Sequence, residues 1–300
     1  MKQQGIALIQ VLLLSTILAV VLLSMNHQAR QHIRLASAVQ QYTQANLALH
    51  SAEAEIIYNL LSNQPFVLQS GNNNTGVPWN FYGKPFDFNQ LTVQIQDTSG
   101  LLSASSPHSA TLSGLVQQFG GSESQSRQIT AALADWQDRN DLARLDGAEQ
   151  PDYRDITVRN GPIQYLEEWL FVKGVTPQLY QQLAPFLTLF PQGVNINQQP
   201  EAVWRANFPA SEVNELVRAR DAGELTPTLF SSITGITIDE FTRFAAGPSY
   251  RIHFTVKNAD VRLGRELTLR LTPYQKQPFD IFEYRLRTPP TENVNATFYN

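Results

Sequence analysis

The stretch IALIQVLLLSTILAVVLLSM, from Ile6 to Met25, decides the first part of the fold. It carries no charged residue, and its polar side chains are those of Gln10, Ser15, Thr16 and Ser24. A helix of about 20 apolar residues crosses the hydrocarbon layer of a bilayer at about 1.5 Å per residue. A cleavable secretory signal would have a shorter apolar region and a small-residue cleavage site, whereas this stretch continues as NHQAR. We therefore predict a membrane-spanning helix. Basic residues on both sides leave its orientation undetermined by charge.

The helix is expected to continue far beyond the membrane, because no glycine or proline lies between Gly5 and Pro65. At 1.5 Å per residue its length would be roughly 90 Å. Apolar residues beyond the membrane recur every three or four positions: Leu35, Ala38, Val39, Tyr42, Ala45, Leu49, Ala52, Ile56 and Leu60. Such a stripe predicts packing on the globular part of the same chain rather than a pure coiled coil.

The composition excludes several classes of function. The 300 residues are 42% hydrophobic, enough for a core and for about two domains. Lys and Arg number 22 against 26 Asp and Glu, a balance that argues against a nucleic-acid binder. The chain has no cysteine and only five histidines, so disulfides, zinc-thiolate sites and cysteine nucleophiles are excluded, and a multi-histidine metal site is disfavoured.

Alternating segments predict a small antiparallel sheet. These segments are Leu91–Gln96, Tyr250–Val256, Arg265–Thr272 and Phe282–Leu286. Residues 62–90, rich in Asn, Gly and Pro, are predicted to form an aromatic-anchored loop. Helical periods dominate residues 101–246, between the strands. We therefore predict an α+β fold in which the long helix packs on a sheet interrupted by a large all-α insertion.

The N-terminus resembles a type IV prepilin leader, with a short basic stub that ends in Gly5 and an apolar helix that begins at Ile6. This resemblance implies that a prepilin peptidase cleaves after Gly5 and methylates the new N-terminus, Ile6. Most members carry a glutamate at the fifth mature position, where this chain has Gln10. A carboxylate buried in the membrane needs a partner such as the amino terminus of a neighbouring subunit. In lacking this glutamate, the chain resembles the K-type minor pseudopilins, which have no subunit above them.

Motifs in the helical block extend the resemblance to K-type pseudopilins of type II secretion systems. They are the run DWQDRND at 135–141, the triplet GAE at 147–149 and the turn VKGV at 172–175. The resemblance implies five segments: a leader at 1–5, a membrane span at 6–25, a pilin-like domain at 26–100 plus 247–287, an inserted helical domain at 101–246 and a flexible tail at 288–300.

The function implied by the resemblance is assembly rather than catalysis. A K-type subunit is a minor pseudopilin at the tip of the pseudopilus, which initiates or limits pseudopilus assembly during export of folded proteins across the outer membrane. The implied location is the bacterial inner membrane, with a single span and a periplasmic C-terminal domain. The implied partners are the I- and J-type minor pseudopilins, the major pseudopilin, the inner-membrane secretion platform and the prepilin peptidase. The helices of partner subunits are expected to contact this chain at Gln10, Leu35, Tyr42 and Leu49.

The acidic segment Asp135–Asp155 is the candidate for site chemistry, with seven carboxylates and three arginines. Oxygen ligands without histidine or cysteine suit Ca²⁺ rather than zinc. The spacing does not match an EF-hand, because Leu142 and Ala143 occupy loop positions 5 and 6. K-type pseudopilins are known calcium binders in this region, so we expect a Ca²⁺ site at Asp138, Asp141, Asp146 and Glu149. A solvated loop held by Arg139, Arg144 and Arg154 is the alternative.

Other functional interpretations are less well supported. The segments Leu166–Leu183 and Leu229–Phe241 have the helix, glycine turn, helix form of some DNA-binding modules, but their charges favour a structural role. The serine-rich run Leu102–Ser113 lacks a G-x-S-x-G elbow, and no phosphate-binding loop is present. The alternative function is a membrane-anchored envelope protein with a helical partner-binding domain outside the secretion apparatus. An unprocessed N-terminus would favour it.

Overall fold

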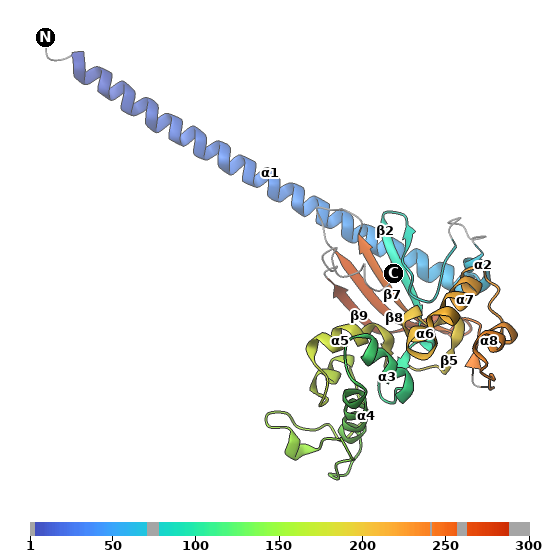
Figure 1. Ribbon diagram of the computed structural model, residues 1–300. Helices are drawn as coiled ribbons and strands as arrows, with labels where there is room; N and C mark the ends of the chain where they lie inside the picture. The colour runs from blue at the N-terminus through green and yellow to red at the C-terminus, as the bar shows by residue number, and fades with distance from the viewer. Residues whose placement is uncertain (1–3, 71–77, 241, 257–262, 288–300) are drawn as a thin grey trace.

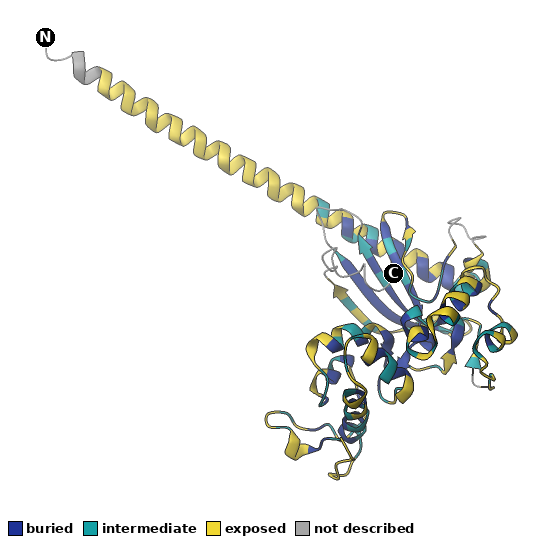
Figure 2. Ribbon diagram, viewed as in Figure 1, coloured by how far each residue is buried: buried dark blue, intermediate teal, exposed yellow. Residues whose placement is uncertain are grey.

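A computed structural model of the chain describes residues 4–70, 78–240, 242–256 and 263–287, with side chains from Leu8 onward. Helix α1 (Gln4–Ser62) runs without a break over 59 residues, as the absence of glycine and proline predicts. It projects far from the rest of the molecule (Figure 1). Every side chain from Leu8 to Gln40 is exposed (Figure 2). Length and apolar composition make α1 the one described helix able to cross a membrane.

The sheet consists of five antiparallel strands in the order β1-β2-β7-β8-β9. Their bounds are β1 (Phe86–Phe88), β2 (Leu91–Asp97), β7 (Ser249–Val256), β8 (Gly264–Leu271) and β9 (Phe279–Arg287). All four predicted strands are confirmed within a few residues. The loop expected at residues 62–90 is wrong at β1, where Phe86 pairs with Val93. It is also wrong at α2 (Pro65–Gln69), a short helix in the same stretch.

One face of the sheet packs against the last part of α1 (Figure 2). Leu49 and Ile56 of the helix join Ile95, Ile252 and Leu267 of the strands in this core. Side chains alternate between the two faces along each strand, so the residues next to these three in sequence lie on the other face of the sheet.

A buried polar contact also fixes α1 against the sheet. The Arg265 guanidinium on β8 donates to Glu53 at 2.7 Å and to the Asn46 amide oxygen at 3.0 Å. Since Arg265 is almost fully buried, the ion pair orients the helix on the strand it contacts.

The chain between β2 and β7 forms the insertion on the opposite side of the sheet (Figure 1). Its α-helices are α3 (Ser109–Gln118), α4 (Glu123–Gln137), α5 (Pro177–Leu183), α6 (Glu201–Asn207), α7 (Ala210–Asp221) and α8 (Pro227–Thr234). Its 3-10 helices are η1 (Thr98–Gly100), η2 (Gln150–Asp152), η3 (Leu166–Phe171), η4 (Ala184–Phe186) and η5 (Ile196–Gln198). Two cores form within it, one around Trp169 and one around Trp204. The insertion is therefore a packed helical unit.

The insertion also contains short strands that the helical pattern did not reveal. These are β3 (Leu102–Ser103), β4 (Leu187–Thr188), β5 (Val194–Asn195) and β6 (Thr242–Arg243), which pair in parallel as β3 with β4 and β5 with β6. The first predicted helix, turn, helix segment forms as η3, a turn at Gly174 with φ of 94°, and α5. The second does not form, because α8 ends at Thr234 and no helix follows in residues 236–240.

The two chain crossings between the sheet and the insertion meet at Asp97. Its buried carboxylate accepts hydrogen bonds from the Ser99 N–H at 2.8 Å and from the Gly247 N–H at 2.5 Å. The two oxygens of one carboxylate thus tie the segment that leaves the sheet to the segment that returns, and they satisfy two donors that would otherwise be buried without partners.

Candidate functional site

The projecting part of α1 is the first candidate site, because apolar side chains continue on it beyond the membrane stretch. Leu35 is 64% exposed and Tyr42 is 53% exposed. Leu49 is only 2% exposed and belongs to the core under the sheet, so it is not available to a partner. Gln10 lies exposed on the same helix. Gly5 and Ile6 lie in its first turns, and their side chains lie outside the described residues.

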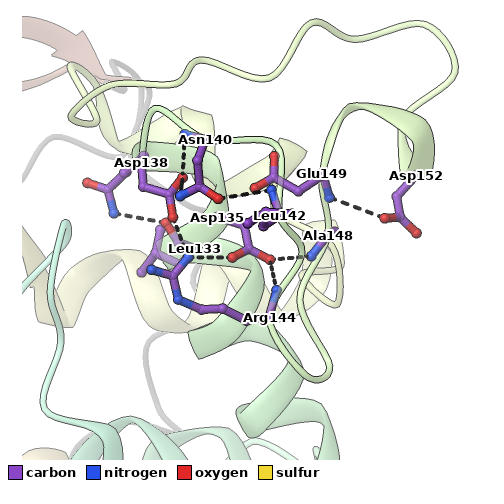
Figure 3. A network of polar contacts seen from close by, with 10 residues as sticks. Leu133, Asp135, Asp138, Asn140, Leu142, Arg144, Ala148, Glu149 and Asp152 are labelled. Atoms are coloured by element: carbon purple, nitrogen blue, oxygen red, sulfur yellow. Dashed lines mark hydrogen bonds and ion pairs between the residues drawn. The ribbon is translucent and has the colours of Figure 1, made fainter.

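The second candidate site is an acidic cluster where α4 ends (Figure 3). Asp135 is in the last turn of α4, Asp138 follows as its C-cap, and Glu149 precedes η2. One carboxylate oxygen from each of these three residues lies within 4.8 Å of the others. Asp141 and Asp146, which the sequence analysis placed in the site, are exposed and lie outside this group.

Asp135 is the fixed member of the cluster. It is fully buried, and its Oδ2 accepts hydrogen bonds from the backbone N–H of Arg144 at 3.1 Å and of Ala148 at 2.9 Å. Gly147 lies close by, where an added Cβ would come within 1.9 Å of the same oxygen. The sequence Gly147-Ala148-Glu149 therefore lets the loop fold back onto the helix end.

Arg144 supplies the positive charge of the cluster. Its Nη1 lies 2.5 Å from Oδ1 of Asp135 and also contacts Oδ2 of Asp138. The hydrogen bond from Arg144 lowers the pKa of Asp138, and the two aspartates raise the pKa of Arg144. The Asn140 backbone and amide N–H groups donate to the other Asp138 oxygen at 3.1 and 2.8 Å. Two carboxylates thus share one guanidinium.

Glu149 is the unbalanced member. It is 2% exposed, and among the described residues neither of its carboxylate oxygens has a hydrogen-bond partner of ordinary geometry. Burial raises the pKa of Glu149, and the charges of Asp135, Asp138 and Asp141 raise it further. Three carboxylates against one guanidinium leave a site that a divalent cation would neutralise, and an all-oxygen donor set fits a hard ion such as Ca²⁺.

Known proteins resemble this chain over most of its length. The family model for type II secretion system protein K matches residues 85–192, which include the whole acidic cluster. The type II secretion system protein K of Klebsiella pneumoniae is 26% identical over 250 residues, 74% of this chain and 76% of that protein. The Aeromonas hydrophila protein K is 26% identical over 228 residues, 65% of this chain and 67% of that protein. The chain belongs to the type II secretion system protein K family.

A solved structure supports the same fold. A chain of the GspK-GspI-GspJ complex from enterotoxigenic Escherichia coli superposes with a TM-score of 0.50 at 19% identity. The match covers 83% of this chain and 97% of that one. As a protein K family member, the chain is a minor pseudopilin of type II secretion, a structural protein and not an enzyme.

The sequence analysis missed Asp135 as a member of the protein K acidic cluster. Asp135 and Asp138 are three residues apart, a spacing that places both side chains on one face of a helix end. Glu149 was among the expected ligands, and its carboxylate lies close to that of Asp138 in the structure. No sequence signal separates these three from Asp141 and Asp146, since all five are acidic and lie within 15 residues.

Proposed function

We propose that this protein K is the tip subunit of a type II secretion pseudopilus. It is anchored in the bacterial inner membrane, its C-terminal domain lies in the periplasm, and it initiates or limits pseudopilus assembly during export of folded proteins. The observation that carries the proposal is the exposed apolar surface of α1 between the membrane stretch and the sheet. Leu35 and Tyr42 lie seven residues apart, about 20° from each other around the helix, and neither contacts the chain's own core.

This apolar surface needs a partner in the assembled state. Apolar side chains at a seven-residue spacing are buried when helices pack side by side. The related GspK was crystallised with GspI and GspJ. We propose that the corresponding I- and J-type minor pseudopilins cover the Leu35 and Tyr42 face here, with the major pseudopilin and the inner-membrane platform as further partners.

Two features support a position at the end of the filament. The insertion widens the domain on the side of the sheet opposite α1 (Figure 1), and a wide subunit is accommodated most easily where no further subunit is stacked on it. Gln10 on the apolar helix carries no charge, so it cannot form an ion pair with the amino terminus of a neighbouring subunit. Both features point to a terminal subunit.

We further propose that the prepilin peptidase removes residues 1–5 and methylates Ile6. The segments then have separate roles: 6–25 crosses the membrane, 26–100 with 247–287 forms the pilin-like domain, and 101–246 forms the inserted domain. The proposed tail at 288–300 lies outside the described residues. The support is the uninterrupted helix from Gln4 and the absence of charge between Ile6 and Met25.

We also propose that the acidic cluster binds Ca²⁺. Asp135, Asp138 and Glu149 would hold it, in place of the larger set expected from the sequence. The ion would supply the positive charge that Glu149 lacks and would fix the loop against the end of α4. The support is the buried carboxylate of Glu149, which has no hydrogen-bond partner of ordinary geometry among the described residues.

Co-purification of the full-length chain with I- and J-type pseudopilins in detergent micelles tests the tip proposal. Unaltered protein is expected to form a stable 1:1:1 assembly at micromolar concentration. The double variant Leu35→Glu with Tyr42→Glu should abolish it, because it places two charges in the apolar contact. The control, Ser37→Glu with Gln44→Glu, has the same charge and the same seven-residue spacing at exposed positions on the opposite helix face. It should leave assembly intact. A strictly monomeric unaltered protein, or equal loss in both variants, contradicts the proposal.

A further inference from the structure

A cleft lies between the sheet and the insertion, on the face of the sheet opposite α1. Its volume is about 960 Å³, within the range of small-molecule sites. The sheet lines it with polar residues from the positions of β7 and β8 that alternate with the core positions, including Arg251, His253 and Glu266. The insertion lines it with the segment around α5 and η4, including Tyr180 and Phe186. The cleft shares no residue with the acidic cluster.

Nearly all basic side chains that line the cleft have a carboxylate partner. The pairs are Lys84 with Asp221 at 3.2 Å, Arg220 with Asp221 at 3.7 Å, Arg265 with Glu53 at 2.7 Å, Arg285 with Glu167, and Arg287 with Glu266. Arg251 is the exception, because it forms no ion pair with any residue in the described part of the chain. Among the described residues, Arg251 is therefore the one arginine or lysine of the cleft without a direct carboxylate contact, and the charges of Glu266 and Glu283 act on it only from a longer distance.

Arg251 is also deeply buried. It is 6% exposed. Its Nη2 donates to the carbonyl oxygen of Leu187 at 2.6 Å and its Nη1 makes a long bond of 3.4 Å to that of Pro185, while its Nε–H has no partner among the residues that the structure describes. A guanidinium keeps its charge in proteins and presents five donors, so these two carbonyls use only part of its capacity. A buried cation in this state is unfavourable unless an anion supplies the missing charge.

The side chains around Arg251 indicate the chemical class of the anion. His253, two residues along β7, has a pKa lowered to about 4 by burial, so it adds a polar but uncharged imidazole near pH 7. Tyr180 and Phe186 add aromatic surface from the insertion. One unpaired guanidinium beside aromatic walls matches a single carboxylate attached to an apolar body, because guanidinium and carboxylate pair through parallel hydrogen bonds.

We propose that the cleft between sheet and insertion binds a carboxylate, which pairs with Arg251 while its apolar body lies against Tyr180 and Phe186. A free organic acid and an acidic side chain on a peptide present the same chemistry. The proposal does not depend on the secretion role, since it uses no residue of the α1 surface or of the acidic cluster.

Calorimetric titration of the full-length chain in detergent micelles, with sodium benzoate as the probe, tests this site. The neutral isostere benzamide is the matched ligand, and ionic strength is held constant with sodium chloride. Benzoate is expected to bind at least tenfold more tightly than benzamide, because only the anion gains charge-assisted hydrogen bonds. Equal heats and affinities for the two ligands, or binding of neither, would overturn the proposal.

Two variants locate the binding. Arg251→Met, which keeps length without charge, should weaken benzoate binding at least tenfold. Arg270→Met removes an exposed arginine of the neighbouring strand β8, outside the cleft, and should change nothing. Unchanged affinity in R251M refutes the assignment. If R251M fails to fold, the comparison of benzoate with benzamide on the unaltered chain decides alone.

Blocked peptides Phe-Glu-Phe and Phe-Gln-Phe then separate the two sources of the carboxylate. Tighter binding of the glutamate peptide than of benzoate identifies a peptide ligand, and weaker binding identifies a free acid.

Discussion

Replacing Glu149 with glutamine is expected to change stability in opposite directions without and with calcium. Without the ion, the glutamate carboxylate is buried, has no hydrogen-bond partner of ordinary geometry in the described part of the chain and faces the carboxylates of Asp135 and Asp138. A buried polar group without a partner costs about 1–3 kcal/mol. The uncharged amide avoids most of this cost. In EDTA, Glu149→Gln should therefore raise the free energy of unfolding by about that amount, and Tm by roughly 2–10 °C.

The pH dependence follows from the raised pKa of Glu149. Between the ordinary glutamate pKa and the raised folded value, the folded chain binds more protons than the unfolded chain. Stability therefore falls as pH rises through this window, and the loss is complete above the folded pKa. Glu149→Gln lacks this titration. In EDTA the variant and the unaltered chain should differ most near pH 7, and the difference should shrink as pH falls through this window.

Calcium should reverse the order. A ligand at a hundredfold excess over its dissociation constant stabilises the folded state by about 2.7 kcal/mol. With Ca²⁺ roughly five- to fiftyfold above dissociation constants of about 0.1–1 mM, the unaltered chain should gain about 1–2 kcal/mol, whereas the variant would lack one of the three carboxylates proposed to hold the ion and should gain much less. Thermal melts of the full-length chain in detergent micelles with EDTA and with about 5 mM Ca²⁺, above the range of weak extracellular sites, measure both effects.

The control for this prediction is Asp141→Asn with Asp146→Asn. It removes two exposed carboxylates outside the cluster and should keep the calcium response. If Glu149→Gln lowers Tm in EDTA, the carboxylate is not destabilising in the apo protein. If it keeps the full calcium response, or if the control loses it, the ligand set is different from Asp135, Asp138 and Glu149.

Three other perturbations test separate features. Gly5→Leu should block leader removal, so the mass of membrane-extracted protein should stay that of the precursor, while unaltered protein shows cleavage plus one methyl group. His253→Gln should make the free energy of unfolding less dependent on pH between 6.5 and about 4. The pKa of His253 is lowered to about 4, so the folded chain resists its protonation and the unaltered protein loses stability as pH falls through this range. With the side chain 32% exposed, the effect should be about 2 kcal/mol in chemical denaturation. Gly114→Ala should cost about 1–3 kcal/mol, because the new Cβ would lie 2.1 Å from the carbonyl oxygen of Ala206, whereas Gly161→Ala, with its nearest atom at 3.8 Å, should be close to neutral in the same denaturation assay.

The elements that depend on local sequence were predictable. Helix α1 follows from apolar composition and the absence of glycine and proline, and strands β2, β7 and β8 follow from strict alternation. Both signals arise between residues a few positions apart, so they can be read without knowing the fold. Strand β1 was missed because three residues are too few for an alternation pattern, and pairing with β2 is what makes them a strand.

The limits of the α1 stripe required the tertiary structure. Leu35, Tyr42 and Leu49 have the same seven-residue spacing, and the sequence treats them alike. Only the docking of the sheet and the Arg265 contact with Glu53 separate them, because these cover Leu49 and leave the other two exposed.

Local sequence features were enough to establish one apolar membrane helix, an α+β fold and an acidic loop suited to oxygen-ligand chemistry. Which of the carboxylates meet depends on how distant segments pack. Asp135 enters the cluster and Asp146 leaves it because the loop after α4 folds back at Gly147 onto the helix end. The cleft at Arg251 likewise forms only when β7 faces the insertion across more than 60 residues of chain, as the bond to Leu187 shows. Composition and periodicity are properties of neighbours in sequence, whereas burial without a partner depends on distant segments that fold onto each other.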